Sequence, residues 1–240
     1  MAVDNLETEL GRLRAEVVEL GRTIEKALLQ SVNVYQAGAS SELRAQTAAI
    51  EPLITLDHEV AKRRFAIEMD CLALIVTQQP EDAELRAMTS MLEIITELEH
   101  IGGYVTEIAR IQYTLARLDE PLLRQLTEVQ YMAERVGDMM AHGLEAFWGQ
   151  DKTLARDVHR SDSEIDDLYA QVYHQLLFFM KGKSRTPIKQ ARYLAQIAHN
   201  LERTADRVTN ICEWVVFAVT GELNAIKQEF GDQVQQEVMR

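Results

Sequence analysis

The sequence LERTADRVTNI at residues 201–211 decides the fold, because it has a counterpart one half-chain earlier, LEHIGGYVTEI at residues 98–108. Both segments begin with Leu-Glu and keep isoleucine in their last position. Upstream, LDHEV at residues 56–60 lines up in the same way with SDSEI at residues 161–165. The two halves therefore match segment for segment, which indicates an internal repeat.

Apolar residues recur every three or four positions along most of the chain, which is the period of amphipathic helices. Glycine and proline number only eleven and four, so few turns are expected. Pro52 is expected to disturb one helix, because proline cannot donate its backbone hydrogen bond. The predicted class is all-α, with two tandem three-helix bundles whose six long helices cover residues 4–36, 41–78, 82–117, 121–149, 152–180 and 188–220.

The repeat divides the chain into three parts. Residues 1–118 form the first three-helix repeat, residues 119–222 form the second, and residues 223–240 form an acidic C-terminal tail. Thr220-Gly221 is typical of a helix stop. Gly102-Gly103 lies inside a predicted helix and follows no strand, so it is expected to permit close helix packing and not to bind phosphate.

Composition excludes several classes of function. The net charge is −13, and no run of Lys and Arg offers the basic patch that nucleic acid or an anionic membrane requires. Cys71 and Cys212 lie far apart in apolar stretches, so they form neither a disulfide framework nor a zinc signature and are expected to be buried thiols in a reducing cytosol. No apolar stretch approaches the roughly twenty residues of a membrane span, and no signal pattern opens the chain. A cytoplasmic protein without direct membrane insertion is expected.

The second half carries two acidic pairs with the same spacing, Asp162 with Asp166 and Glu202 with Asp206. Residues four apart lie on one face of a helix, where like charges repel each other. A cation held between the two helices would offset that repulsion. Carboxylate oxygens are hard ligands that suit magnesium, manganese, calcium or iron better than copper. The sequence therefore offers these four residues as candidate metal ligands.

Two other interpretations of the acidic pairs remain open. They are either solvated faces of an acidic protein, or Arg203 and Arg207 neutralise the second pair through salt bridges. Other chemical signals are weak. Glu97 and His100 form one E-x-x-H motif without a second, and the chain has no H-E-x-x-H, P-loop or G-x-S-x-G motif. No nucleophile with an adjacent base is visible, so an enzyme is not predicted.

These motifs resemble those of the PhoU family. Residues 201–211 are similar to its signature of Leu-Glu-Arg, an aspartate four residues after the glutamate, and Asn-Ile. Residues 162–168 resemble its other acidic motif, and residues 78–80 resemble its glutamine–proline turn, with Glu84 where aspartate is usual. Residues 219–222 resemble its ending. The resemblance covers nearly the whole chain, including the tandem repeat.

The resemblance implies an elongated, non-catalytic protein of two three-helix bundles, often a homodimer. It implies E/D-x-x-x-D motifs that bind clusters of divalent or trivalent metal ions, with magnesium, manganese, iron and zinc as candidates. It also implies a regulator that couples a phosphate ABC transporter to a sensor histidine kinase and represses the phosphate-starvation response when phosphate is plentiful. The transporter's ATPase subunit and the kinase are the implied partners.

The first repeat departs from this pattern. It keeps Asp57 and Glu99, but Ala61 and Gly103 stand where the second carboxylates belong, and His100 replaces the usual arginine. Hard metal ions depend on the number and charge of their ligands. The first-repeat site is therefore degenerate, and metal binding in the manner of the family is predicted for the second repeat only.

Two alternatives to a phosphate regulator remain open. One is a metal-binding helical protein that stores metal or uses the second-repeat carboxylates for metal-dependent hydrolysis. The other is a paralogous helical scaffold with another partner and no metal. Turnover of a phosphoester that disappears in Asp206→Ala would favour the first of these.

Overall fold

The computed structural model of the chain describes residues 2–33, 48–116, 127–180 and 185–222, together with residue 226. These residues contain helices and no strand, so the all-α class is confirmed. The elements are α1 (Ala2–Asn33), the short 3-10 helix η2 (Glu51–Thr55), α3 (Leu56–Gln78), α4 (Asp82–Ala116), α5 (Thr127–Gly149), α6 (Lys152–Arg160), α7 (Asp162–Met180) and α8 (Arg185–Thr220). None of these helices is long and apolar enough to span a membrane.

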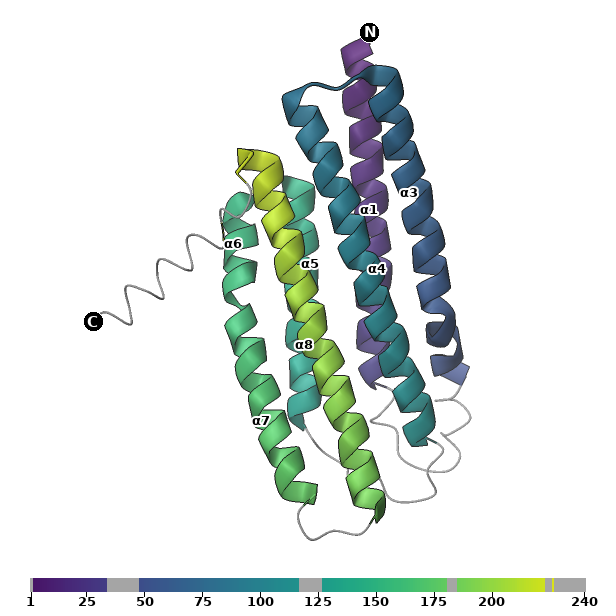
Figure 1. The fold of residues 1–240 in the computed structure, drawn as a ribbon, viewed down its shortest axis with the longest axis vertical. Helices are drawn as coiled ribbons and strands as arrows, with labels where there is room; N and C mark the ends of the chain where they lie inside the picture. The colour runs from purple at the N-terminus through teal and green to yellow at the C-terminus, as the bar shows by residue number, and fades with distance from the viewer. Residues whose placement is uncertain (1, 34–47, 117–126, 181–184, 223–225, 227–240) are drawn as a thin grey trace, which may run out of the picture.

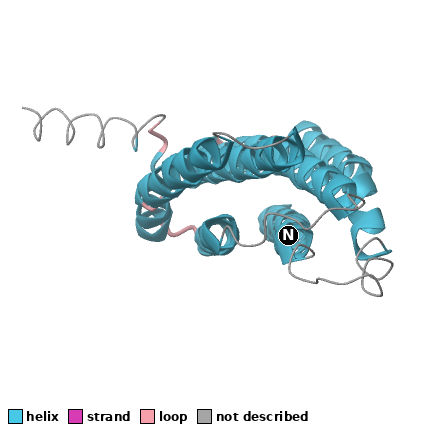
Figure 2. Ribbon diagram, turned by 90° about the horizontal axis from the view of Figure 1, so that it is seen from below, coloured by secondary structure: helices cyan, strands magenta, loops and turns pink. Residues whose placement is uncertain are grey.

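The helices stand side by side along the long axis of the molecule (Figure 1), and Figure 2 views them from one end. We call α1, η2, α3 and α4 the first repeat, and α5 to α8 the second. The most extensive contact between helices joins α4 to α8, and α1 packs against α5, so the two repeats share a broad interface. At the outer edges, α3 packs on α4 and α7 packs on α8.

Buried residues follow the helical period predicted from the sequence. In α1, the fully buried side chains recur at intervals of three and four: Leu13, Val17, Leu20, Ile24 and Leu28. Burying each such side chain stabilises the fold by about 1.5–3 kcal/mol relative to leaving it exposed. The helices α4 and α8 bury residues along most of their lengths, because each contacts its own repeat and the other one.

Two predicted helices are interrupted. Pro52 lies in η2, between helical residues 48–50 and α3, so the expected disturbance is confirmed. The helix predicted over residues 152–180 is divided at Ser161 into α6 and α7. The Ser161 hydroxyl donates to the carbonyl of Val158 at 2.7 Å, and that of Ser163 donates to the carbonyl of Arg160 at 3.1 Å. Such side-chain bonds compete with the regular helical pattern.

One predicted helix end is confirmed, and one predicted helix start is wrong by three residues. Gly221 follows α8 with φ of +76°, which confirms the stop at Thr220-Gly221. The side chain of Asp151 accepts hydrogen bonds from the backbone of Thr153 and Leu154 and so caps α6. The helix α8 begins at Arg185, three residues earlier than predicted.

Several predicted boundaries cannot be compared with the structure. Predicted helix residues 34–36 and 41–47, the boundary near residue 118 and the turn residues 181–184 all lie outside the described residues. Of the predicted tail, the structure describes Ile226, which is buried.

The glycine pair in α4 serves close packing at one of its two positions. A Cβ atom on Gly102 would lie 3.2 Å from the side chain of Val60, so α3 approaches α4 closely there. A Cβ on Gly103 would meet nothing within 4 Å. The predicted packing role therefore holds for Gly102 and is wrong for Gly103. Cys71 and Cys212 are buried free thiols, as predicted.

Candidate metal centre on the second repeat

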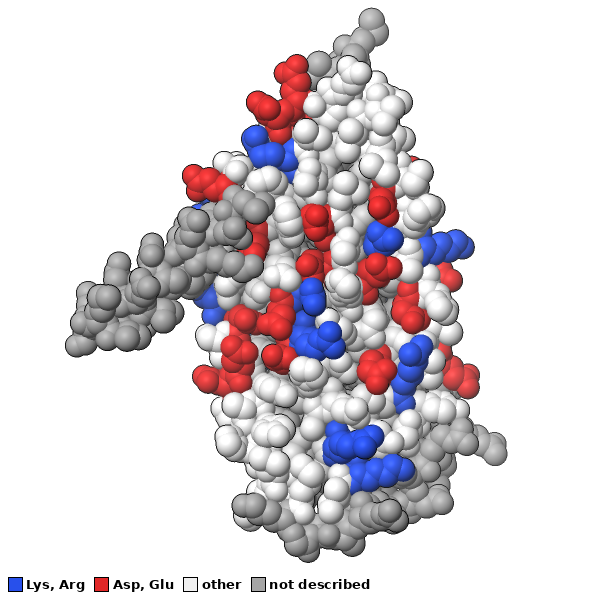
Figure 3. Space-filling model, viewed as in Figure 1, with Lys and Arg blue, Asp and Glu red and all other residues white. Residues whose placement is uncertain are grey.

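The two predicted acidic pairs are brought together where the beginning of α7 packs beside α8. Asp162 lies close enough to Asp166, Asp206 and Glu202 for each of them to disfavour its ionisation. Burial, followed by these repulsions, raises the pKa of Asp162 to about 6. Figure 3 shows acidic side chains gathered on this face, over α7 and α8. We refer to these four residues as the four-carboxylate cluster.

The protein balances the charge of this cluster only in part. Burial raises the pKa of Glu202, with Asp206 as the next cause, and burial raises the pKa of Asp206, with Asp166 as the next cause. Arg207, Arg203 and His199 lower the pKa of Asp206, and His199 lowers that of Glu202, but burial and the neighbouring carboxylates raise both pKa values by more. Excess negative charge of this kind attracts a cation.

The neighbouring arginines of α8 turn toward the first repeat. Nη1 of Arg207 lies 3.2 Å from Oε2 of Glu97, and its Nε donates to the hydroxyl of Tyr104 at 3.3 Å. The guanidinium of Arg203 lies over the ring of Tyr104, 4.3 Å from its centroid. The interpretation that both arginines form salt bridges with the second acidic pair is therefore wrong, although the charge of both arginines lowers the pKa of Asp206.

Glu97 and Tyr104 hold α4 to α8 through contacts that the sequence did not predict. Glu97 also accepts a hydrogen bond from Asn210 at 3.3 Å. Arg207 and Asn210, both within residues 201–211, therefore bind α4 of the other repeat. More than a hundred positions separate these partners in the sequence, and no local pattern marks them as a pair. Residues 201–211 thus make two sets of contacts. Glu202 and Asp206 lie near the carboxylates of α7, whereas Arg207 and Asn210 bind α4.

An acidic residue in the same motif shows how an ordinary carboxylate is balanced. Glu164 points to α5, where Arg135 donates to it at 2.8 Å and the Tyr131 hydroxyl donates at 3.1 Å. These bonds hold the pKa of Glu164 below its usual range. The pKa of Asp162, two residues earlier, moves in the opposite direction, so the two faces of α7 differ in their charge balance.

The environment of Oε2 of Glu202 indicates whether these residues fit a metal ion. Oε2 of Glu202 is buried without an aligned hydrogen bond, and Nδ1 of His199, 3.3 Å away, forms an ion pair with it only when the imidazole is protonated. A buried acceptor without a donor is costly unless a cation satisfies it. The donor set consists of carboxylates, which suits magnesium, manganese or iron and suits zinc less well.

The four carboxylates lie near enough to influence one another's ionisation without being gathered around one point. Among the described residues, no group of three or more His, Cys, Asp or Glu side chains already has the spacing of a metal site. The cluster therefore supplies the charge and the donor type for a hard cation, and side-chain rotation would have to complete the coordination.

The first-repeat candidates lie in a different environment. Oδ2 of Asp57 is 3.7 Å from Nη2 of Arg110, and Oε2 of Glu99 is 3.0 Å from Nε of Arg64. Each carboxylate already has a positive partner, so this pair does not fit a metal ion.

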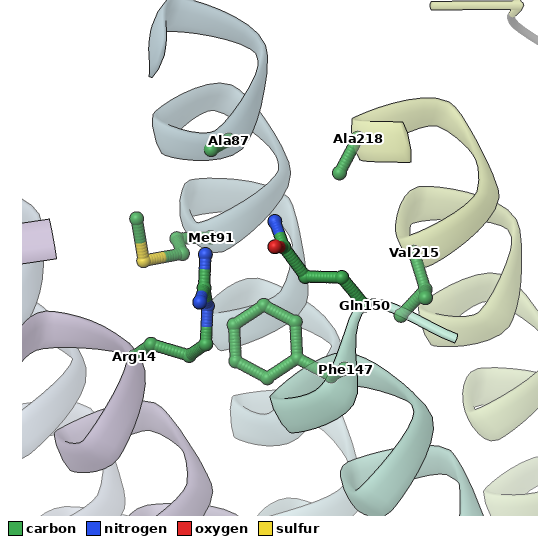
Figure 4. A pocket seen from close by; sticks show the side chains of 7 residues that line it. All are labelled: Arg14, Ala87, Met91, Phe147, Gln150, Val215 and Ala218. Atoms are coloured by element: carbon green, nitrogen blue, oxygen red, sulfur yellow. The ribbon is translucent and has the colours of Figure 1, made fainter. Parts of the chain in front are cut away.

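A small cavity between the repeats offers no second chemical site. Its lining residues come from α1, α4, α5, the turn after α5, and α8 (Figure 4): Arg14, Ala87, Met91, Phe147, Gln150, Val215 and Ala218. Burial lowers the pKa of Arg14. The lining is mainly apolar and includes no nucleophile or general base, so it gives no reason to assign catalysis.

Comparison with known proteins matches both halves of the chain to the same domain. The model of the PhoU domain matches residues 17–112 and again residues 129–215. A phosphate-specific transport system accessory protein PhoU homolog from Caulobacter vibrioides is 30% identical over 214 residues, which are 89% of each chain. A homolog of the same name from Deinococcus radiodurans is 27% identical over 216 residues, 90% of this chain and 97% of the relative.

Solved structures agree with the fold. The phosphate transport system regulatory protein PhoU from Streptococcus pneumoniae superimposes with a TM-score of 0.79 at 26% identity, covering 91% of this chain and 98% of that one. PhoU from Pseudomonas aeruginosa gives a TM-score of 0.80 over 90% of this chain at 24% identity, which supports the fold alone.

Proposed function

Because the chain belongs to the PhoU family, we propose that it is an accessory protein of a phosphate-specific transport system. The observation that carries this proposal is the match of the PhoU domain to both halves, along with relatives of that name that cover most of the chain. PhoU-family accessory proteins are non-catalytic regulators, so the prediction that the chain is not an enzyme is confirmed.

In more detail, the protein couples a phosphate ABC transporter to a sensor histidine kinase in the cytoplasm and represses the starvation response when phosphate is plentiful. The transporter's ATPase subunit and the kinase are its partners. An acidic, helical surface supports protein partners over nucleic acid, since the net charge is −13. The protein acts as a homodimer.

An exposed apolar stripe on α3 supports the proposal of protein partners. Phe65, Met69, Leu72 and Val76 are each at least 42% exposed and recur at intervals of four, three and four. That spacing places them on one face of the helix, as in helices that pack against another helix. Contiguous exposed apolar side chains of this kind mark interaction surfaces.

The second repeat binds a hard metal ion through Asp162, Asp166, Glu202 and Asp206. The ion supplies positive charge that offsets the repulsion within the cluster and ties α7 to α8. The raised pKa of Asp162 supports this proposal, and so does the buried oxygen of Glu202, whose neighbour His199 carries charge only when protonated. Magnesium, manganese and iron match the donor set best.

The metal proposal is tested by elemental analysis of the full chain after dialysis against manganese. We expect metal in the wild-type protein and almost none in Asp206→Asn, because that change removes one ligand and one charge. Asp167→Asn is the matched control, since Asp167 is an exposed acidic residue on α7, outside the cluster. Equal metal in all three proteins would refute the assignment.

The regulatory proposal is tested by affinity capture from a detergent extract of the native host at high and low phosphate, analysed by mass spectrometry. We expect phosphate-dependent enrichment of a phosphate-transporter ATPase and a sensor kinase. Phe65→Lys should weaken capture, whereas Ile188→Lys changes an exposed residue of similar character outside the stripe and should not. Absence of both partners would mean that the family match describes the fold only.

A further inference from the structure

In the first repeat, Arg64 lies on the helix face that corresponds to the proposed metal-binding face of the second repeat. Asp57 aligns with Asp162, and the same alignment of α3 with α7 sets Arg64 opposite Tyr169. Both residues follow the aligned aspartate by two helical turns and therefore lie on the same face as it. The structure supports the equivalence, because Arg64 approaches Glu99 in one repeat and Tyr169 lies near Glu202 in the other.

Arg64 joins the two helices of its repeat. Its Nη1 lies 2.7 Å from Oε2 of Glu68, also on α3, and its Nε lies 3.0 Å from Oε2 of Glu99 on α4. The side chain is 24% exposed, and Nε is buried without an aligned hydrogen bond, so the contact with Glu99 is a close charge pair. In the second repeat the corresponding contact between helices has Tyr169, a neutral phenol, beside His199 at a ring separation of 6.1 Å.

From this difference, we propose that the guanidinium of Arg64 permanently takes the place of a metal ion in the first repeat. The inference rests on the proposed metal site of the second repeat. A guanidinium keeps its charge at all relevant pH values and repels a second cation beside it. Its contact with Glu99 supplies the link between α3 and α4 that an ion would supply between α7 and α8. The first repeat is thus held together independently of metal supply, and the chain responds to metal through one repeat.

The structure leaves room to rebuild the missing site. A Cβ on Gly103 meets nothing within 4 Å, so a side chain fits there. Ala61 is partly exposed on α3, one turn after Asp57. Aspartate at both positions would restore the pattern of the second repeat, with Asp57 and Ala61→Asp on one helix and Glu99 and Gly103→Asp on the next.

This gives a test by gain of binding in the full chain. All variants carry Asp162→Asn and Asp206→Asn, so that manganese can bind only to the first repeat, and Arg110→Gln, which removes the positive partner of Asp57. The first variant adds Ala61→Asp and Gly103→Asp, and the second adds Arg64→Tyr to these. The matched control adds Arg63→Tyr in place of Arg64→Tyr, since Arg63 instead pairs with Glu19 on α1 at 3.3 Å. Manganese per chain is measured after dialysis, and circular dichroism confirms that each variant is helical.

We expect bound manganese only when Arg64 is replaced, with an affinity at least about tenfold above that of the other two proteins, because a full positive charge has been removed beside the ligands. Equal binding with and without Arg64 would overturn the proposal, and so would failure of every folded variant to bind. Measuring the wild-type chain in parallel separates the second-repeat metal site from the role of Arg64. A wild-type chain without bound manganese would refute the second-repeat site. A gain of manganese binding on replacing Arg64 would still uphold the role of Arg64.

Discussion

Replacement of Asp162 by asparagine should stabilise the metal-free protein at neutral pH. The pKa of this carboxyl is raised from 3.8 to about 6. A carboxyl whose pKa is higher in the folded state contributes stability that is fully present below the unfolded pKa near 3.8 and is lost as pH rises through 6. At neutral pH the ionised group therefore opposes folding, and asparagine removes that cost.

The size of the effect follows from the shift in pKa. At about 1.4 kcal/mol per pKa unit, raising the pKa from 3.8 to about 6 gives an upper value of about 3 kcal/mol. Asp162 is partly exposed, and solvent screening reduces this figure to on the order of 1–2 kcal/mol. The free energy of unfolding of Asp162→Asn should therefore exceed that of wild type by this amount at about pH 7.5, and the difference should shrink toward about pH 5.

Urea unfolding in EDTA, followed by far-UV circular dichroism, measures this difference. The midpoint should rise in Asp162→Asn while the denaturant slope stays constant, because the folded state keeps its compactness. Asp167→Asn, an exposed position on the same helix, should show no such gain. Excess manganese should reverse the order, since a ligand that binds only the folded wild type stabilises it. A variant less stable than wild type in EDTA would show that the protein already balances the Asp162 charge.

Two further predictions concern packing and thiol chemistry. Gly21→Ala should lower the free energy of unfolding by about 1–3 kcal/mol, because its Cβ would overlap the Leu144 side chain of α5. Gly11→Ala has open space around the new Cβ and should raise the free energy of unfolding by up to about 1 kcal/mol. Thermal unfolding of the two variants measures this difference. Cys71 and Cys212 should resist a chromogenic thiol reagent in the native protein at neutral pH and react after unfolding, since burial raises the pKa of both thiols, that of Cys71 to about 11. Rapid labelling of the native chain would contradict the second prediction.

Much of the fold was determined by sequence pattern alone. Apolar residues at three- and four-residue spacing placed the buried stripe of α1, and the repeated Leu-Glu segments divided the helices into two matching sets. Local signals such as Pro52 and Gly221 marked an interruption and an end, because each acts through its own backbone. The spacing of four within each acidic pair likewise established which carboxylates share one helix face.

Tertiary structure alone decided which faces meet and which charges are balanced. Arg207 pairs with Glu97 and Arg64 with Glu99, and both choices depend on how whole helices pack. Burial beside α8 raises the pKa of Asp162, whereas Arg135 on α5 lowers that of Glu164 on the same helix. Spacing along one helix is a local property of the chain, but burial and charge balance depend on neighbours that lie far away in sequence. Only the packed bundle therefore distinguishes a carboxylate that is balanced by an arginine from one whose ionisation is disfavoured.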